Sequence, residues 1–258
     1  MNITVEPAGR TGNRLFQYAL GLILAKDKQC NFFAEPIPFF GNIDYGKTEQ
    51  LSPDAIRTSM FGDFDYDYHF LLKTDKDIII DSFVQKADLL VKNRDFLCDM
   101  FSCKQIIDLL PEPDELVIHI RETDYKAINV YLGDDIYKDI IRKYNFAKNT
   151  IVTDNINSEL IKELVQNYNC SVFTKQMSVD WRYPYFSENE LNDFNYIKHS
   201  KNIFISQSTF SWWAAFLNKE ANVIVPYRSD NNGIWKLIPT AGDIDLHTNI
   251  SNWKKHIY

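Results

Sequence analysis

Three hydroxyl groups and two tryptophans stand close together in one short segment of the chain. Ser206, Ser208 and Thr209 follow an apolar run that is typical of a strand, and apolar residues at helical spacing come next. Hydroxyl groups and the free backbone amides of a helix N-terminus bind anions such as phosphate. We therefore expect an anion site here, with Trp212 and Trp213 packing onto a sheet to anchor the helix. Capping and core packing alone are the simpler interpretation.

An imidazole and a guanidinium stand two residues apart after another apolar run. Side chains two positions apart in a strand point to the same face, so His119 and Arg121 should lie side by side. A guanidinium suits a phosphate, and the neighbouring imidazole suits a base or a ribose. The simpler interpretation is a core histidine and a surface arginine paired with Glu122 or Asp124.

A carboxylate marks the end of a third expected strand. Asp154 follows the run of residues 150–153 and precedes a helical pattern that begins near residue 156. A ligand contact is one interpretation of this position, and capping of the next helix is the simpler one.

The fourth candidate is a glycine-containing segment after the first expected strand. Residues 8–14 read as a loop in which Arg10, Asn13 and Arg14 supply hydrogen-bond donors. Glycines such as Gly12 let the backbone approach a ligand closely. The spacing is neither a dinucleotide fingerprint nor a phosphate-binding loop, and a turn before a helix is the simpler interpretation.

Composition excludes several classes of protein. Of the 258 residues, 45% are hydrophobic and 14% are aromatic, too many for a disordered or fibrous chain. The net charge is −7, and no block of five like charges occurs, which argues against a general binder of nucleic acid or anionic membranes.

Compartment and cysteine chemistry follow from simple patterns. The four cysteines lack the spacing of a zinc site, and we interpret them as reduced core thiols. The chain shows neither a signal peptide at its start nor a long apolar run, so we expect no transmembrane segment and a cytoplasmic location. Peripheral membrane association stays open.

Strands and helices alternate along the chain. In the first half we expect a strand at 2–6, a helix around 15–24, loops with short helices at 36–76, a strand at 78–80 and a helix at 86–110. The Pro-Glu-Pro at 111–113 is the best linker, so we divide the chain into α/β domains of residues 1–112 and 113–258.

The second half is more regular. We expect strands at 115–120, 149–153, 170–173, 202–206 and 222–225, the last closed by Pro226, and helices near 134–144, 156–167, 188–199 and 209–218. Strands separated by helices form parallel crossovers, which predicts a doubly wound parallel sheet. Ligands of such sheets lie beyond the carboxyl ends of the strands, where all four polar segments fall.

The polar segments, taken in order, resemble glycosyltransferase family 11, the α-1,2-fucosyltransferases. The segments that carry the resemblance are Gly-Arg-Thr-Gly-Asn-Arg-Leu-Phe-Gln-Tyr-Ala at 9–19, His-Ile-Arg-Glu-Thr-Asp-Tyr at 119–125, Thr-Asp-Asn at 153–155 and Ser-Gln-Ser-Thr-Phe-Ser-Trp-Trp-Ala-Ala at 206–215, with Phe-Val-Gln at 83–85. The resemblance implies a GT-B enzyme with two Rossmann-like domains and a cleft between them, which transfers fucose from GDP-fucose to a glycan with inversion and without a metal or other cofactor.

The resemblance also implies residue roles. Arg121 would contact the β-phosphate and stabilise the departing GDP, and His119 would face the nucleotide. The GDP-fucose-binding residues that it implies are Arg10, Gly12, Asn13, His119, Asp124, Asp154, Ser206, Ser208, Thr209 and Phe210. The first three would act from the N-terminal, acceptor-side domain, and the others from the C-terminal, GDP-sugar-binding domain.

The chain departs from the family pattern at two positions. Glu122 stands where the family usually has a second arginine, and Arg14 where it usually has glutamine. Strand alternation predicts that the Glu122 side chain points away from Arg121. No catalytic base is assigned among Glu6, Glu122 and Asp124.

Three alternatives stay open at this stage. The first is a related GT-B transferase that uses another nucleotide sugar. The second is a metal-dependent GT-A enzyme, for which the acidic series Asp63, Asp65 and Asp67 offers a superficial Asp-x-Asp motif. The third is a non-catalytic nucleotide-binding or glycan-binding protein whose aromatic loops stack on sugars through Tyr66, Tyr68, Trp181 and Tyr183. The acceptor, the linkage and the oligomeric state also stay open.

Overall fold

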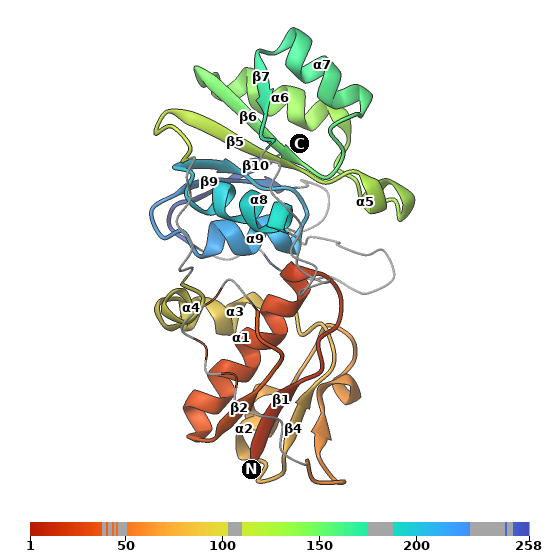
Figure 1. Cartoon of the computed structure of the whole chain (residues 1–258), viewed down its shortest axis with the longest axis vertical. Helices are drawn as coiled ribbons and strands as arrows, with labels where there is room; N and C mark the ends of the chain where they lie inside the picture. Colours follow the sequence, from red (N-terminus) through yellow and green to blue (C-terminus); the bar gives the residue numbers. More distant parts are fainter. Residues whose placement is uncertain are drawn as a thin grey trace. The chain divides into compact units, whose positions relative to one another are not determined.

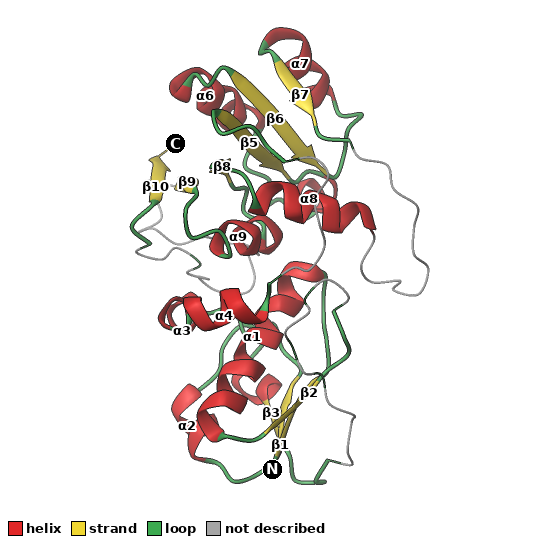
Figure 2. Cartoon of the chain, turned by 60° about the vertical axis from the view of Figure 1, so that its left-hand side comes forward, coloured by secondary structure: helices red, strands yellow, loops and turns green. Residues whose placement is uncertain are grey.

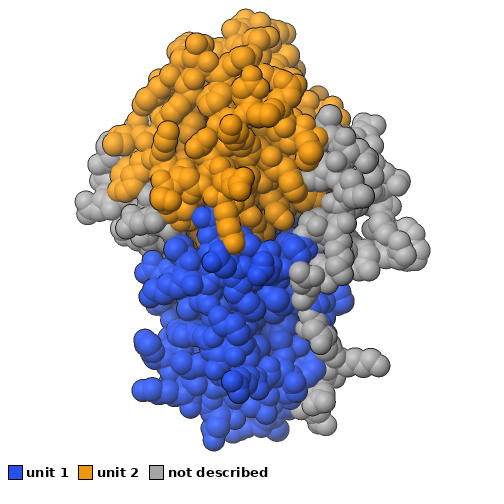
Figure 3. All heavy atoms as spheres, turned by 90° about the vertical axis from the view of Figure 1, so that its left-hand side faces the viewer, with its two compact units in different colours: residues 1–105 blue, residues 106–258 orange. Residues whose placement is uncertain are grey.

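The protein has an α/β fold built on two parallel sheets (Figure 1). The computed structural model describes residues 1–37, 40, 43, 45, 51–102, 110–174, 188–227, 246 and 250–257. The chain divides into two compact units, Met1–Gln105 and Ile106–Tyr258, which Figure 3 colours separately. The predicted division after residue 112 stays a prediction, and each unit is described by itself below.

Unit 1 holds a parallel sheet of four strands in the order β2-β1-β4-β3. Its strands are β1 (Asn2–Val5), β2 (Asn31–Phe33), β3 (Ile56–Arg57) and β4 (Ile78–Ile80). Its helices are α1 (Thr11–Lys28), the 3-10 helix η1 (Thr58–Phe61), α2 (Tyr68–Lys73), α3 (Ala87–Lys92) and α4 (Arg94–Met100). The apolar spacing predicted α1 because Leu15, Phe16 and Ile23 form the buried stripe that packs on the sheet.

Two expectations for unit 1 need correction. The segment at 8–14 is not all loop, because α1 already begins at Thr11. The single helix expected at 86–110 is interrupted at Asn93, and its part beyond residue 102 lies largely outside the described residues. The Asn93 side chain donates a hydrogen bond to the Leu89 carbonyl at 3.0 Å and accepts one from Lys26 at 2.6 Å. Such local bonds compete with helix continuation and explain the break.

Unit 2 holds a parallel sheet of six strands in the order β10-β9-β8-β5-β6-β7. Its strands are β5 (Glu115–Ile120), β6 (Lys148–Thr153), β7 (Cys170–Val172), β8 (Asn202–Phe204), β9 (Asn222–Tyr227) and β10 (Trp253–Ile257). Its helices are α5 (Thr123–Ala127), α6 (Asp134–Tyr144), α7 (Glu159–Asn167), α8 (Glu188–Lys198) and α9 (Thr209–Phe216). The chain builds the sheet outward from β5 to β7 and then returns to the other side of β5, so the predicted doubly wound sheet is confirmed.

Helices cover both faces of this sheet (Figures 1 and 2). On one face, Ile118 and Ile120 of β5 pack in a core cluster with residues of α6 and α7 such as Ile140 and Leu164. The alternate side chain His119 meets the ring of Phe210, the second residue of α9, on the opposite face. One face of β5 is therefore wholly apolar core, and the other carries the polar candidates.

The edge of the sheet beyond β8 departs from the prediction. Pro226 lies inside β9 rather than closing it, because β8 pairs with β9 only as far as Ile224. In the sheet, Pro226 pairs with His256 of β10 and lies beyond the last pair of β8 and β9. Because proline has no backbone N–H, this position suits it: no hydrogen bond to β8 is lost. The strand β10 was not predicted, because its Trp-Lys-Lys-His-Ile sequence carries too much charge to read as a buried strand.

None of the helices in the described part of the chain combines the length and the apolar character that a membrane-spanning helix requires. Cys30, Cys98 and Cys170 carry free thiols, and burial raises the pKa of the Cys170 thiol to about 11. These three positions agree with the interpretation as reduced thiols, and Cys103 lies outside the described residues.

The two tryptophans of α9 are fully buried, as predicted. Trp212 stacks on Phe216 with ring centroids 4.7 Å apart and meets Trp253 of β10 edge to face. Its indole N–H donates a hydrogen bond of 2.7 Å to the Leu246 carbonyl. The ring of Trp213 lies 5.3 Å from that of Trp212. These contacts hold helix α9 against β10.

We predict that Trp212→Ala lowers the free energy of unfolding by about 3 to 5 kcal/mol, because it removes a fully buried ring and opens a cavity. Urea denaturation of the two proteins measures the difference. Ile156→Ala is the matched control in the same unit, since the Ile156 side chain is exposed, and its effect should stay within about 0.5 kcal/mol. Equal stabilities of Trp212→Ala and the parent protein would contradict the anchoring role.

Candidate functional site

The sheet of unit 2 has its topological switch point between β5 and β8. In open α/β sheets, ligands bind beyond the carboxyl ends of the two strands at this point. There the Nδ1 atom of His119 lies 2.7 Å from the hydroxyl of Ser206. The ring of Phe210 lies 5.7 Å from the imidazole. The structure thus brings three of the predicted residues together. His119 meets Ser206 and Phe210, which follow it by 87 and 91 positions in the sequence.

His119 is a buried, neutral histidine. Burial lowers the pKa of its imidazole to about 4, and the carboxylate of Asp154 offsets only part of this shift. An uncharged imidazole can hold the Ser206 hydroxyl in one orientation but supplies no positive charge to an anion. The fixed cation at this edge is therefore the neighbouring arginine.

Arg121 follows β5 directly and is held by two carboxylates. Its Nε and Nη2 atoms donate to the two carboxylate oxygens of Asp124 at 2.8 and 2.9 Å. The Nε atom also lies 3.3 Å from a carboxylate oxygen of Asp154. This bidentate arrangement confirms the pairing with Asp124 that the simpler interpretation expected. Within the described residues, the Nη1 atom of Arg121 has no hydrogen-bond partner, so its two N–H groups can donate to a phosphate.

Asp154 ties the end of β6 to the turn that follows β5. Its carboxylate accepts hydrogen bonds from the backbone amides of Glu122 at 2.9 Å and Thr123 at 3.3 Å, and from the Thr123 hydroxyl. The expectation that Asp154 caps the next helix is wrong, because Ser158 caps α7 through the amide of Ile161. The carboxylate instead satisfies amides at the start of α5 and orients the guanidinium of Arg121.

Glu122 points away from Arg121, as strand alternation predicted. Its carboxylate is buried and pairs with Lys126, 2.5 Å away and one helical turn later. The second carboxylate oxygen has no hydrogen-bond partner in the part of the chain that the structure describes. Glu122, which stands where the family usually has an arginine, therefore pairs with Lys126 and does not contact the Arg121 guanidinium.

Tyr125 is a member of this site that we did not single out from the sequence. Its phenol lies close to Ser208, and its ring lies 5.8 Å from the Arg121 guanidinium. Burial raises the pKa of Tyr125 to about 12. The residue lies within the segment at 119–125, but nothing in its position along α5 indicated that it would reach the start of α9. Tyr125 thus connects the arginine to the hydroxyl segment.

The hydroxyl segment forms the N-terminus of α9. Ser208 occupies the N-cap position with an extended backbone, yet its hydroxyl makes no capping bond. The Ser208 side chain therefore does not cap α9, and it lies close to Tyr125. The first amides of a helix have no partner within the helix, so the start of α9 directs backbone donors toward this edge of the sheet.

The N-terminal candidates lie together in unit 1, at the start of α1. Arg10 precedes the helix, and Gly12 and Asn13 lie in its first turn. The side-chain oxygen of Asn13 accepts a hydrogen bond of 2.9 Å from Gln85, which follows β4. Gly9 has a φ of +75°, and a Cβ atom there would lie 2.5 Å from the amide nitrogen of Asn13. This position needs glycine, because any side chain would collide with Asn13.

The acidic series of the metal-dependent alternative does not converge. Asp65 pairs with Lys86, and Asp67 caps α2 by accepting from the amide of Phe70 at 2.9 Å. Asp63 contributes its backbone carbonyl, which accepts from the amide of Phe83 at 2.6 Å. Within the described ranges, no three His, Cys, Asp or Glu side chains gather in a way that could hold a metal ion. Trp181 and Tyr183 lie outside the described residues.

Comparisons with known proteins place the fold. No model of a known protein family matches the sequence, and no curated protein matches it. The structure is similar to an arginine-to-lysine mutant of FUT1 from Arabidopsis thaliana solved with GDP, with a TM-score of 0.55 at 11% identity over 94% of this chain and 73% of that one. This likeness confirms the predicted α/β class with two parallel sheets, the GT-B fold.

Two further solved structures have lower scores. Escherichia coli heptosyltransferase WaaC with ADP has a TM-score of 0.48 at 12% identity, over 100% of this chain and 93% of that one. POFUT1 in complex with GDP-fucose has a TM-score of 0.43 at 9% identity, over 86% of this chain and 94% of that one.

The buried imidazole predicts a pH dependence of stability. The unfolded chain binds a proton at His119 below about pH 6.5, whereas the folded protein does so only below about pH 4. The free energy of unfolding should therefore fall as the pH decreases through this window, by at most about 1.4 kcal/mol per pH unit from this group.

Urea denaturation at several pH values measures the slope, and His119→Gln should make it shallower. NMR titration of the imidazole provides the direct check. A midpoint between pH 6 and 7 for His119 would contradict its burial as a neutral group.

Proposed function

We propose that the chain is an inverting glycosyltransferase that moves L-fucose from GDP-fucose to O2 of a galactose residue in a glycan acceptor. The observation that carries this proposal is that the end of β5, which Arg121 follows, meets the start of α9 at the switch point of a doubly wound sheet, where His119 contacts Phe210. A fixed cation and a helix N-terminus at that position suit a diphosphate. The family 11 pattern of the matching segments supports the choice of donor.

Unit 2 is the donor side in this proposal. The diphosphate binds the free Nη1 donors of Arg121, the hydroxyl of Ser208 and the amides of Thr209 and Phe210. His119 stays neutral beneath it and orients Ser206. Asp124 and Asp154 act through Arg121, because both carboxylates hold its guanidinium in place. Unit 1 is the acceptor side in this proposal, and Arg10, Gly12 and Asn13 are its proposed substrate-binding residues.

The reaction is a single displacement at the anomeric carbon. The oxygen of an acceptor hydroxyl forms a bond to this carbon as the bond to the β-phosphate oxygen breaks, and the hydroxyl proton leaves to a base or to solvent. The bonding electrons depart with GDP, so negative charge develops on the β-phosphate in the transition state. Arg121 stabilises this charge without reorganising, because its two carboxylate contacts already fix its orientation.

The donor identity, the absence of a metal requirement and a cytoplasmic location belong to the same proposal. The proposal assigns no residue as catalytic base, since departure of GDP is the step that the site assists. Glu6, one of the three carboxylates considered for that task, forms a bidentate pair with Arg57 at 2.8 and 3.0 Å. That pairing engages both oxygens of the Glu6 carboxylate.

The deciding experiment is GDP release from GDP-fucose with a panel of β-galactoside acceptors, with and without a chelator. The proposal expects release that depends on the acceptor and resists the chelator. Release from another nucleotide sugar, with none from GDP-fucose, would assign a different donor. Binding of GDP without turnover of any donor would favour a non-catalytic protein.

In this assay, Arg121→Ala should lower the transfer rate by about a hundredfold or more, because one preorganised charge contact in the transition state contributes about 3 to 4 kcal/mol. Arg121→Lys keeps the charge but loses the bidentate geometry, so its transfer rate should lie between those of the parent protein and of Arg121→Ala. Arg142→Ala is the matched control: this arginine lies on α6 and contacts Tyr168. Near-normal transfer by a folded Arg121→Ala protein would exclude the proposed role.

A further inference from the structure

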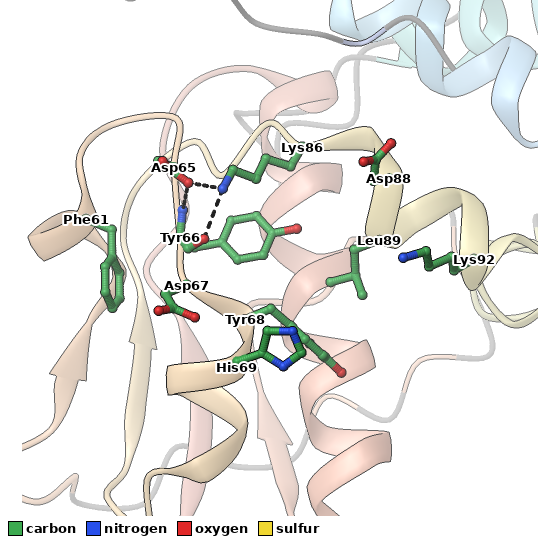
Figure 4. A pocket seen from close by; sticks show the side chains of 10 residues that line it. All are labelled: Phe61, Asp65, Tyr66, Asp67, Tyr68, His69, Lys86, Asp88, Leu89 and Lys92. Atoms are coloured by element: carbon green, nitrogen blue, oxygen red, sulfur yellow. Dashed lines mark hydrogen bonds and ion pairs between the residues drawn. The ribbon is translucent and has the colours of Figure 1, made fainter. Parts of the chain in front are cut away.

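Unit 1 contains a pocket of about 630 Å³ that the donor site does not use (Figure 4). It opens between the start of α2 and α3, and the loop before α2 forms its third side. All of its lining residues belong to unit 1 and are described by the structure. Its volume falls within the range of about 300 to 1,000 Å³ that is typical of small-molecule sites.

The floor of the pocket is a tyrosine with a buried ring and a hydroxyl that faces the open space. Tyr66 is only 6% exposed, and its ring lies beneath the ammonium group of Lys86 at 5.1 Å. Figure 4 shows its hydroxyl pointing into the space on the side of Asp88 and Leu89. No hydrogen-bond partner of this hydroxyl is found among the described residues. This hydroxyl is therefore open to a hydrogen bond with a ligand or water in the pocket.

Aromatic rings form much of the pocket lining. Phe61, Tyr68 and His69 line the pocket together with Tyr66. The rings of Tyr68 and His69 meet edge to face, 6.2 Å apart. The Tyr68 hydroxyl donates to Asp27, which fixes the orientation of that ring. Flat rings at fixed positions suit the apolar C–H faces of a sugar.

The charged lining is almost balanced. Asp65 and Lys86 neutralise each other, and Lys86 also donates to the Tyr66 carbonyl at 3.1 Å. Asp88 and Lys92 stand one helical turn apart on α3, and neither has an ion-pair partner among the described residues. Asp67 also lines the pocket and caps α2, so three carboxylates face two ammonium groups, which gives the lining a net charge of −1. This favours a neutral polyhydroxyl ligand over a nucleotide or another polyanion.

We propose that this α2–α3 pocket is a saccharide-binding site, which holds a neutral sugar unit of the glycan acceptor other than the one that reacts. The inference rests on the proposed function in one respect, namely that the acceptor is a glycan. The sugar ring packs on the aromatic side chains, while its hydroxyls bond Tyr66, Asp88 and Lys92. Binding at such a second site lets a polymeric acceptor gain affinity through a sugar that does not react.

The test is titration of the full chain with lactose and with a neutral galactose-containing tetrasaccharide, followed by ligand-observed NMR. Tyr66→Phe should weaken tetrasaccharide binding about fivefold, because it removes one hydrogen bond. Asp88→Asn should weaken it about tenfold, because it removes a charged acceptor. Sialyllactose, which adds a negative charge, should bind less tightly than lactose.

Matched controls distinguish the pocket from general effects. Tyr45→Phe removes a hydroxyl of unit 1 outside the pocket, and Asp95→Asn removes a carboxylate from the first turn of α4. Both should bind the tetrasaccharide like the parent protein. GDP binding, measured in parallel, should be the same in all five proteins.

The outcomes separate this inference from the proposed function. Tetrasaccharide binding that survives both pocket substitutions, or no saccharide binding by a protein that binds GDP, would overturn the pocket assignment alone. Loss of tetrasaccharide binding in the pocket variants would support it even if GDP-fucose were not turned over, in which case only the proposed reaction would fail.

Discussion

The reversal of strand order between β5 and β8 is the constraint on which the candidate site depends. Parallel strands that grow outward in both directions from this point leave their carboxyl ends without a crossover helix between them. The hydrogen bond between His119 and Ser206 joins the two strands at this point. Because both residues are buried, the bond is shielded from water, and the imidazole stays neutral. The position of the α9 N-terminus follows from this junction on one side and from the buried tryptophans on the other.

Charge balance shapes the surface above that junction. Arg121 carries one positive charge and contacts two carboxylates, so this group has a net negative charge as it stands. A diphosphate can bind only where donors outweigh this charge, which makes the free Nη1 atom, Ser208 and the amides of α9 decisive. The same carboxylates restrict the rotamers of the arginine. The two carboxylates therefore weaken the attraction of the site for an anion but fix the orientation of the Arg121 guanidinium. This arrangement favours stabilisation of a charge that develops in the transition state over tight binding of the ground state.

Unit 1 shows a corresponding arrangement at the carboxyl ends of its central strands. Gln17 donates to the Ser82 carbonyl at 2.9 Å, and Gln85 donates to Asn13, so two hydrogen bonds tie the start of α1 to the segment after β4. Val84 in that segment has a φ of +46°, an unfavourable conformation for a β-branched residue. Strain of this kind persists only where surrounding contacts enforce it, and here the buried Val84 side chain provides them. Lys86, the next residue in the sequence after this segment, lines the α2–α3 pocket.

Much of this arrangement was predictable because it depends on local patterns. The apolar runs at 115–120 and 78–80 are strands in the structure, and the spacing at 134–144 is a helix with those bounds. The alternation of side chains along β5 separated His119 from Ile118 and Ile120 correctly. Local chemistry was misleading where a side chain had more than one available partner: Asp154 bonds the amides before α5 rather than capping α7, and the bonds of Asn93 interrupt the helix expected at 86–110.

The sequence by itself determined which residue types stand at strand ends, since strand ends follow from periodicity and turn residues. Only the tertiary structure decided which ends meet. The contacts of Tyr125 with Ser208, and of Asp154 with Arg121, join segments about 30 to 80 residues apart, and no periodicity encodes them. The same holds for the burial of Tyr66 and for the lining of its pocket. A long-range contact depends on the packing of whole elements against each other, and that packing minimises the free energy of the fold rather than of any one segment.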